Sequence, residues 1–442
     1  MNKIKSAVAI LLCLCAVVSL PACKRLSPLP RPAASINTII SVKKLEAPVY
    51  GHRDSAAENA AKGANAFAFR FGSELVKNTG DSNFVCSPYS VWLPLAALVN
   101  ATDAEHKDEL LAALGASGIT ESDISRASSR MLYNLTKQQN LEGEYSKDYH
   151  YNPLKIANAI FVDFGMRLKR EFEQMFADYF RGTAMSVDFE HPEAVDAVNQ
   201  WASENTDGLI TNIVQEFDPD TVVAIANAIY FSDRWTWEFN PDETTENVFH
   251  SPNGNTTAQF MLREGDILPY YEDDLVQAIP LTFKSGGGMY IILPKSGEAT
   301  ELLNSMTNDY FTTICEGTEL KTGKLLLPRF KLESDVMDLK DALILLGVPL
   351  FDEAASPLTG GLIESDIPVW LSSAVQKAYI EVDEKGTTAA AVTVMTAPAG
   401  AAPPEPTKPF EMICNRPFVF VLYEWTYDGG NQVLFTGVVN KP

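Results

Sequence analysis

The sequence predicts an α+β domain with at least one large, mostly antiparallel sheet. Helix-like patterns prevail in the first half of the chain and strand-like patterns in the second. The last residues, 407–442, add two strand-like runs, RPFVFVLYEW and QVLFTGVV, around a turn at 428–430. Because a lone hairpin is marginal in water, these two runs must pair with the sheet of the preceding domain.

The spacing of apolar residues predicts the elements in chain order. Phe67, Phe71 and Leu75 recur every four residues and predict an amphipathic helix that closes at Gly80. A short strand that runs into a buried helix is predicted over 83–100. The further predictions are a strand at 153–164, a helix at 167–176, a helix from His191 to near Gly208, a long buried strand at 221–235, and strands within 288–294, 323–333 and 369–386.

The N-terminus has the pattern of a targeting segment. Lys3 and Lys5 precede an apolar run at 7–20, which is short for a bilayer span. The run ends in LPAC, which predicts a signal peptide over residues 1–22 and lipid attachment at Cys23; an ordinary cleaved signal is the alternative. Residues 23–58 are interpreted as a lipid-anchored flexible tether. We therefore expect an exported protein on a bacterial cell envelope or surface, or otherwise a secreted one.

The charge and the cysteines exclude several kinds of partner. The net charge of −22 argues against nucleic acid and heparin-type polysaccharide, both of which need clusters of Lys and Arg. Cys86, Cys315 and Cys414 lie far apart in apolar surroundings and are interpreted as small core residues. We therefore expect no metal ion and no cofactor.

No familiar catalytic motif is present in the sequence. It contains no Gly-x-Ser-x-Gly, no His-Glu-x-x-His, no phosphate loop and no Cys-x-x-Cys. The five histidines stand in polar or loop-like contexts without ligand spacing. A catalytic triad needs no local signature, yet the sequence favours a protein that is not an enzyme.

The segment DEKGTTAAAVTVMTAPAGAAPPEP, residues 383–406, is rich in small residues. From 386 to 404 it holds no charge and no aromatic ring. A linker rich in Ala and Pro is one interpretation of this composition. Because the strands that follow belong to the preceding domain, the segment is better interpreted as an excursion that leaves one domain and returns to it.

Several motifs resemble those of the serpins, the family of serine protease inhibitors. MICNRPFVFVL at 412–422 resembles the C-terminal signature of that family. Other matches follow in the family's order: NFVCSPYSV (83–91), IANAIFV (156–162), VNQWASENTDGLI (198–210), ANAIYFSDRW (226–235) and EVDEKGTTAAAVT (381–393). The resemblance implies a serpin fold over 59–442, with a large central sheet, further sheets and surrounding helices.

The resemblance also implies a role for the small-residue segment. In inhibitory serpins it is a reactive-centre loop, here about 384–404, which a serine protease cleaves and which then enters the main sheet. Its hinge would comprise Glu384, Gly386, Thr387, Thr388, Ala389, Ala390 and Ala391, with Thr387 the first residue that must enter the sheet. A period of two places small or flexible side chains on the inward face at Thr387, Ala389, Ala391, Thr393, Met395 and Ala397.

Counting along the usual loop length predicts a reactive bond between Gly400 and Ala401, with Ala399 as an alternative. Small residues there imply an elastase-like or subtilisin-like target protease, held as a covalent acyl complex. A non-inhibitory serpin that acts as a binding or structural lipoprotein is the alternative. We expect a monomer.

Further residues match mechanical positions of the family. Ser87, Pro88, Ser90 and Asn227 correspond to the shutter beneath the central strands, and Trp235 corresponds to the breach where insertion begins. Arg329 and Glu384 match positions that commonly pair at the top of the sheet. The sequence departs from the family at Gln376, which replaces the usual shutter histidine and removes pH-dependent gating there. It departs again at SDRW (232–235), where a turn containing Lys-Gly is more common.

Overall fold

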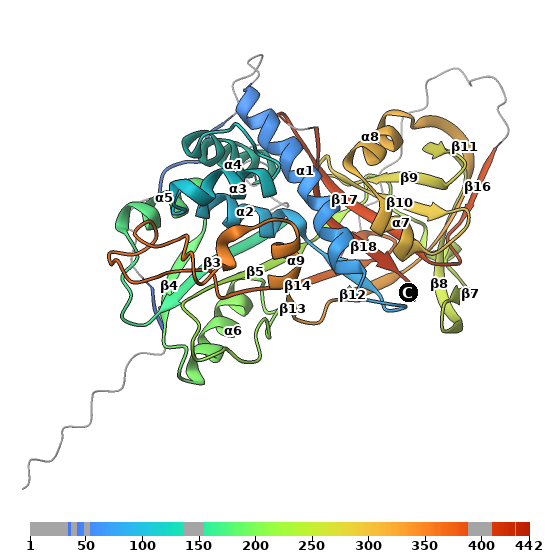
Figure 1. Cartoon of the computed structure of the whole chain (residues 1–442). Helices are drawn as coiled ribbons and strands as arrows, with labels where there is room; N and C mark the ends of the chain where they lie inside the picture. The colour runs from blue at the N-terminus through green and yellow to red at the C-terminus, as the bar shows by residue number, and fades with distance from the viewer. Residues whose placement is uncertain (1–33, 37–41, 48–53, 137–153, 388–408, 429) are drawn as a thin grey trace, which may run out of the picture. The chain divides into compact units, whose positions relative to one another are not determined.

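The structure is a computed structural model of the 442-residue chain, shown in Figure 1. It describes residues 34–36, 42–47, 54–136, 154–387, 409–428 and 430–442. All of these belong to one compact unit, Ala33–Pro442. The helices are α1 (Ser55–Val76), α2 (Pro88–Leu98), α3 (Ala104–Ala113), α4 (Glu121–Thr136), α5 (Arg170–Phe180), α6 (Glu193–Asn205), α7 (Ala299–Ser305), α8 (Asn308–Glu316) and α9 (Lys340–Leu345).

The first sheet, called the central sheet here, has nine strands. Its order is β1-β4-β3-β5-β14-β15-β6, and β12 and β13 also pair with β14. The strands are β1 (Ala34–Ile36), β3 (Leu154–Asp163), β4 (Thr183–Val187), β5 (Val223–Phe231), β6 (Asp233–Arg234), β12 (Phe330–Glu333), β13 (Met337–Asp338), β14 (Ser373–Val382) and β15 (Gly386–Thr387). Most neighbours are antiparallel, whereas β3–β4 and β5–β14 are parallel.

The second sheet also has nine strands, in the order β16-β11-β8-β9-β10-β17-β18-β2, with β7 paired to β8. These strands are β2 (Phe84–Cys86), β7 (Thr245–Ser251), β8 (Gly254–Glu272), β9 (Val276–Thr282), β10 (Gly288–Pro294), β11 (Glu319–Pro328), β16 (Phe410–Ile413), β17 (Phe418–Thr426) and β18 (Gly430–Val439). The two C-terminal runs of the sequence are thus β17 and β18, paired with each other inside this sheet. The predicted α+β class with a large, mostly antiparallel sheet is confirmed.

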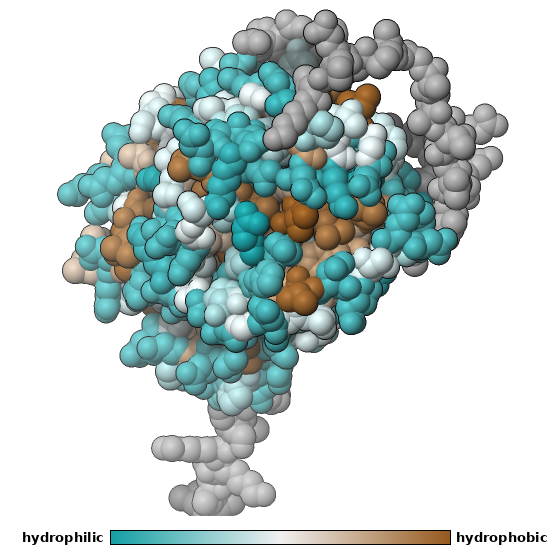
Figure 2. Space-filling model, turned by 90° about the vertical axis from the view of Figure 1, so that its right-hand side faces the viewer, coloured by the Kyte–Doolittle hydropathy of each residue, from teal (hydrophilic) through white to brown (hydrophobic). Residues whose placement is uncertain are grey.

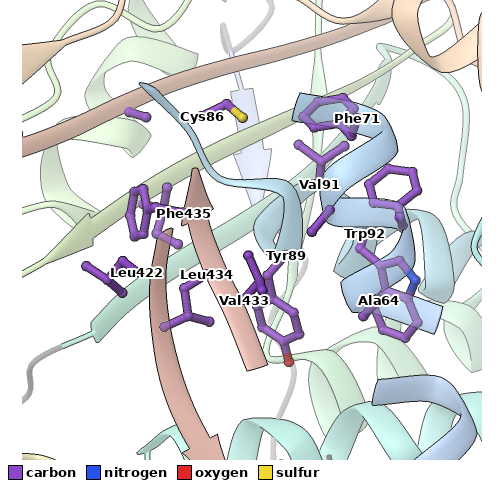
Figure 3. Close-up of a cluster of buried hydrophobic side chains, with 14 of the residues drawn as sticks. Ala64, Phe71, Cys86, Tyr89, Val91, Trp92, Leu422, Val433, Leu434 and Phe435 are labelled. Atoms are coloured by element: carbon purple, nitrogen blue, oxygen red, sulfur yellow. The ribbon is translucent and has the colours of Figure 1, made fainter. Parts of the chain in front are cut away.

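The core forms where α1 and α2 pack on the second sheet. Figure 3 shows Phe71, Trp92 and Phe435 within this buried cluster. Apolar residues occupy almost all of α2, which explains why the helix is buried on every side. A separate buried cluster joins α6 to the opposite face of β3 and β5, including Val198 and Trp201. Side chains on both faces of β3 and β5 are therefore buried, one face in each cluster.

The predicted long strand at 221–235 is divided in the structure. It runs as β5 to Phe231, and a separate short strand, β6, follows Ser232. The division occurs because β5 pairs with β14, whereas β6 pairs with β15. The predicted helix that begins at His191 is present as α6.

The predicted tether, 23–58, is wrong in its extent. Residues 34–36 form β1, which extends the central sheet by pairing with β4. Farther along, the Lys43 amide donates to the Asp178 carboxylate at 2.8 Å, and the Glu46 amide donates to the Ser129 hydroxyl at 2.9 Å. Helix α1 then begins at Ser55, capped by Asp54. The tether interpretation fails there because backbone groups find partners on the domain, which scattered polar composition does not reveal.

Within the described ranges, no helix is both long enough and apolar enough to cross a bilayer. The three cysteines outside the N-terminal segment are free, and Cys86 and Cys414 are buried as predicted, whereas Cys315 is partly exposed.

Candidate functional site

The candidate site lies between β5 and β14 in the central sheet. These two strands are parallel neighbours, with Ser373–Tyr379 opposite Ala224–Tyr230. Beyond that stretch, β15 lies between their continuations: Thr387 pairs with Val382 on one side and with Asp233 on the other. Both pairings are antiparallel, so the short strand β15 separates the continuations of two parallel strands at one end. This arrangement is called the wedge here.

Gly386 has a backbone conformation that requires glycine. Its φ angle is +148°, and a Cβ atom there would collide with the carbonyl oxygen of Asp233. The turn before it is tightened by Asp383, whose carboxylate accepts from the Lys385 and Gly386 amides at 2.8 and 3.1 Å. Gly386 therefore lets the chain reverse from β14 into β15 in close contact with β6.

Thr387 is already in the sheet, which corrects the expectation that it enters only after cleavage. It is fully buried. The Asp233 amide donates to its hydroxyl at 2.8 Å, and the Ser232 hydroxyl donates to its carbonyl at 3.0 Å. A substitution at Thr387 would thus disturb the uncleaved form itself. A test of loop insertion therefore needs a substitution at a residue after Thr387.

Trp235 holds this end of the sheet in place. Its backbone amide donates to the Lys385 carbonyl at 2.8 Å, and its indole N–H donates to the Asp383 carbonyl at 2.9 Å. The ring stacks on Phe283 at a centroid separation of 4.6 Å. The tryptophan predicted at the breach thus bonds directly to the turn that leads into β15.

Glu384 and Arg329 form the pair that the sequence predicts. The Arg329 Nη2 atom lies 2.7 Å and its Nε atom 2.8 Å from Glu384 Oε1, and the Thr244 hydroxyl donates to the same oxygen at 2.5 Å. The Glu384 side chain is 6% exposed and that of Arg329 45% exposed. Burial opposes ionisation of Glu384, but the hydrogen bonds from Arg329 and Thr244 outweigh burial and lower the pKa of its carboxyl group.

We expect Glu384→Lys to accelerate spontaneous entry of the loop into the sheet. The change removes the hydrogen bonds to Arg329 and Thr244 and places two cations together beside the turn. We expect the variant to form polymers on heating, or to insert its uncleaved loop, about tenfold faster than the wild type. A barrier to loop entry that is lower by ~1.4 kcal/mol corresponds to this factor of ten. Native gel electrophoresis after incubation at a fixed temperature measures this rate. An unchanged rate would show that the pair does not restrain the hinge.

Acid is expected to have the same effect on the wild-type protein. Because the folded-state pKa of Glu384 is lowered, its ionised form stabilises the fold fully above the unfolded pKa of about 4.3. That contribution is lost as the pH falls through the folded-state value. The rate of polymer formation should therefore rise below about pH 4 in the wild type and vary less in Glu384→Gln. Parallel pH dependences in the two proteins would contradict this assignment.

The shutter residues form one buried network centred on Gln376. Its side-chain carbonyl accepts from the Ser87 amide at 2.9 Å, and its Nε2 donates to the Ser87 carbonyl at 2.8 Å. Nε2 also lies 3.0 Å from the Ser90 hydroxyl and 3.3 Å from Asn227 Oδ1. Ser90 donates a hydrogen bond to Asn227, and Pro88 is the first residue of α2. The network ties β14 and β5 to the start of α2.

Asn158 belongs to this network, although the sequence analysis did not single it out. The Asn227 amide donates to Asn158 Oδ1 at 2.6 Å, and the two asparagines are directly opposite in the β3–β5 ladder. The sequence IANAI occurs at 156–160 and again at 225–229, and this repeat could have predicted that Asn158 pairs with Asn227. Thr244 was also missed, and no motif marks it.

The remaining predicted site residues lie outside the described residues. They are Cys23, Thr388, Ala389, Ala390, Ala391, Ala399, Gly400 and Ala401.

Comparisons with known proteins bear on the family and the fold of the chain. The family profile "Serpin (serine protease inhibitor)" matches residues 62–442. An uncharacterised serpin-like protein of Methanosarcina acetivorans is 30% identical over 399 residues, which cover 88% of this chain and 88% of the relative. Serine proteinase inhibitor A3K of Cavia porcellus is 27% identical over 388 residues, covering 85% and 88% of the two chains. Serpin48 of the insect Tenebrio molitor superposes with a TM-score of 0.74 at 25% identity, over 89% of this chain and all of that one.

The chain belongs to the serpin family. Members of this family are in general protease inhibitors and not catalysts, although some serpins are not inhibitory.

Proposed function

We propose that this serpin irreversibly inhibits serine proteases by loop cleavage followed by insertion of the loop into the central sheet. The observation that carries the proposal is the wedge formed by β15, which pairs antiparallel with β14 and β6 at one end of a parallel pair. Continuation of this strand would separate β5 from β14 and pair with both. One parallel ladder would be replaced by two antiparallel ladders, the more stable type of pairing.

The register of β15 determines which residues would insert. If the pairing Val382–Thr387 continues, Thr396 comes opposite Ser373, the first residue of β14. Directly opposite residues share a face, so Ala389, Ala391, Thr393 and Met395 would face the core beside Ile380, Ala378, Gln376 and Ala374. All four of those β14 residues are buried. Slim or flexible side chains suit that face.

Insertion would release enough free energy to make the inhibition irreversible. Roughly ten additional ladder hydrogen bonds at ~0.5–1.5 kcal/mol each contribute ~5–15 kcal/mol. That amount is comparable to the stability of a typical domain. A protease still attached through its acyl bond would be carried along the sheet and distorted.

The same register supports a reactive bond at Gly400–Ala401. Cleavage must occur beyond Thr396 for the whole of β14 to acquire a new partner, and Gly400 satisfies this condition. Little or no side chain at this position suits elastase-like or subtilisin-like proteases and excludes trypsin-like pockets, which require Arg or Lys. Ala399 is the alternative residue before the bond.

Incubation with pancreatic elastase is expected to give a complex that resists detergent and boiling. Mass spectrometry of the products should find a peptide that begins at Ala401 and ends at Pro442, which is 42 residues long. An amino terminus before residue 396 would contradict the register. Complete cleavage without any complex would favour the non-inhibitory alternative, a binding or structural serpin.

The proposal includes export and lipid attachment at Cys23. It is supported by the basic start, the apolar run and the LPAC sequence. In a bacterial host, Cys23→Ser should move the protein from the detergent phase to the aqueous phase in a Triton X-114 partition. If the wild type and Cys23→Ser distribute between the two phases in the same way, lipid attachment at Cys23 is contradicted.

A further inference from the structure

Two cavities adjoin at the end of β5 and β14 that lies opposite to β15. One has a volume of about 850 Å³ and the other about 660 Å³, and Glu353 and Trp370 line both. Together they are called the Trp370 groove here. Its wall is tied together by Ser372, whose amide donates to the Val223 carbonyl at 2.8 Å and whose hydroxyl accepts from the Val222 amide at 3.0 Å. The groove is therefore separate from the candidate site around β15.

The larger cavity, called the acidic cavity here, carries a strong negative charge. Five carboxylates line it, those of Glu216, Asp218, Asp220, Asp338 and Glu353. Among the described residues Lys340 is the only basic side chain in its lining, so five negative charges and one positive charge give −4. In the part of the chain that the structure describes, none of the five carboxylates forms an ion pair. The cavity therefore attracts a cation.

A buried hydroxyl in the acidic cavity also lacks a partner. Thr221 lines this cavity and is only 4% exposed. Its amide donates to the Asp218 carbonyl at 2.9 Å, but its hydroxyl forms no hydrogen bond with any described residue. Because buried polar groups are as a rule hydrogen-bonded, this hydroxyl indicates a ligand with a polar group at its side. An ammonium N–H could donate to it and to the carboxylates alike.

The acidic cavity suits an organic cation better than a metal ion. Within the described ranges, no three His, Cys, Asp or Glu side chains come together closely enough to hold a metal ion. The partly buried ring of Trp370 and that of Phe217 also line the cavity, and aromatic faces attract organic ammonium groups. Phe217 is held in place by an edge contact with Phe189 at a centroid separation of 4.8 Å.

The smaller cavity, called the apolar cavity here, continues the groove beyond Glu353 and Trp370. Its other lining residues are mostly apolar and include Met166, Val222, Ala354, Ile367 and Pro368. Ile367 is 52% exposed. Hydrophobic residues also gather on the side of the molecule with β8 and β11 (Figure 2), so exposed apolar area alone does not define a site. This cavity differs because it opens directly into an acidic one, and a ligand that fills both would carry a positive head and an apolar tail.

We propose that the Trp370 groove binds amphiphilic organic cations, with the ammonium group in the acidic cavity and an alkyl chain in the apolar cavity. The ammonium would donate to the carboxylates of Asp220 and Glu353 and to the Thr221 hydroxyl. The chain would lie along Trp370 and against Ile367. Binding does not rest on the proposed inhibition, because the groove is complete in the uncleaved protein and its lining contains no residue of the loop.

The test is calorimetric titration of the uncleaved protein, without any protease, with octylammonium below its micelle concentration. A Kd of about 0.1–1 mM is expected for a ligand of this size. Methylammonium, which lacks the tail, and octanoate, which has the tail and the opposite charge, should each bind roughly tenfold or more weakly. No binding of octylammonium, or equal binding of octanoate, would overturn the proposal.

A pair of matched variants locates the head group. Asp220→Asn/Glu353→Gln should weaken octylammonium binding by about fivefold or more, since it removes two carboxylates from the acidic cavity. Glu364→Gln/Asp366→Asn removes the same charge from exposed positions outside the groove and should change the Kd by less than about twofold. The side chains of Asp220 and Glu353 form no hydrogen bond or ion pair with described residues, so this variant should melt at the wild-type temperature. Equal affinities of the two double variants would overturn the proposal.

A second pair locates the tail. Ile367→Ser should weaken octylammonium binding by about threefold, because it removes apolar surface from the apolar cavity. Leu345→Ser, at a position that is 73% exposed on α9 and outside the groove, should leave the Kd unchanged. If both single variants bind octylammonium as the wild type does, the alkyl chain does not lie in this groove and the proposal fails.

Discussion

Ala391→Arg is expected to convert the protein from an inhibitor into a substrate of the same protease. In the continued register, Ala391 comes opposite Ala378, which is fully buried on the core face of β14. Insertion would bury a cation without a partner, at an effective cost of several kcal/mol. Since each ~1.4 kcal/mol slows a step tenfold, hydrolysis of the acyl-enzyme would overtake insertion. The number of inhibitor molecules consumed per protease inactivated measures this change directly.

The matched control is Ala390→Arg. In the same register, residue 390 comes opposite Tyr379, on the face that carries the partly exposed side chains of Lys377 and Glu381. This variant should inhibit nearly as well as the wild type. If Ala391→Arg inhibits as efficiently as Ala390→Arg, the loop does not enter the sheet in this register.

Gln376→Ala is expected to lower the free energy of unfolding by about 2–5 kcal/mol. The change leaves the buried amide and carbonyl of Ser87 without their side-chain partner, and each unsatisfied buried group costs roughly 1–3 kcal/mol. Loss of contact with Ser90 and Asn227 should also loosen β14 from β5. Urea unfolding followed by circular dichroism gives the change in free energy.

Lys377→Ala provides the control, because Lys377 is the next residue on β14 and pairs with Glu333 on the partly exposed face. Its effect should stay within about 1 kcal/mol. A Gln376→Ala protein as stable as Lys377→Ala would mean that the shutter network does not hold the two strands together.

The sequence predicted the parts of the site that local motifs encode. ANAIYFSDRW and EVDEKG identified Asn227, Trp235 and the turn into the loop, and apolar spacing identified α1, α2, α6 and the main strands. These predictions succeed because each depends on neighbouring residues. The pairing of Glu384 with Arg329 was predicted only through the resemblance, because 55 positions separate the two residues.

Other features depend on tertiary contacts that no local pattern contains. Thr387 is buried because Ser232 and Asp233 supply hydrogen bonds from a strand more than 150 positions away. Residues 34–36 and 42–47 join the domain through backbone pairing with β4 and contacts to α4 and α5, which polar composition alone does not predict. The register shift between Gly323 and Lys324 in the β8–β11 ladder likewise follows from pairing between strands.

The most direct test of the central claim is the melting temperature before and after cleavage within residues 388–408. A brief treatment with a protease that cuts there, followed by scanning calorimetry, compares the two forms. Insertion of the new strand predicts a rise of roughly 6–19 °C, since ~5–15 kcal/mol of added stability is divided by an unfolding entropy of ~0.8 kcal/mol per degree for a domain of this size. An unchanged or lowered melting temperature of the cleaved protein would contradict insertion and, with it, the proposed mechanism of inhibition.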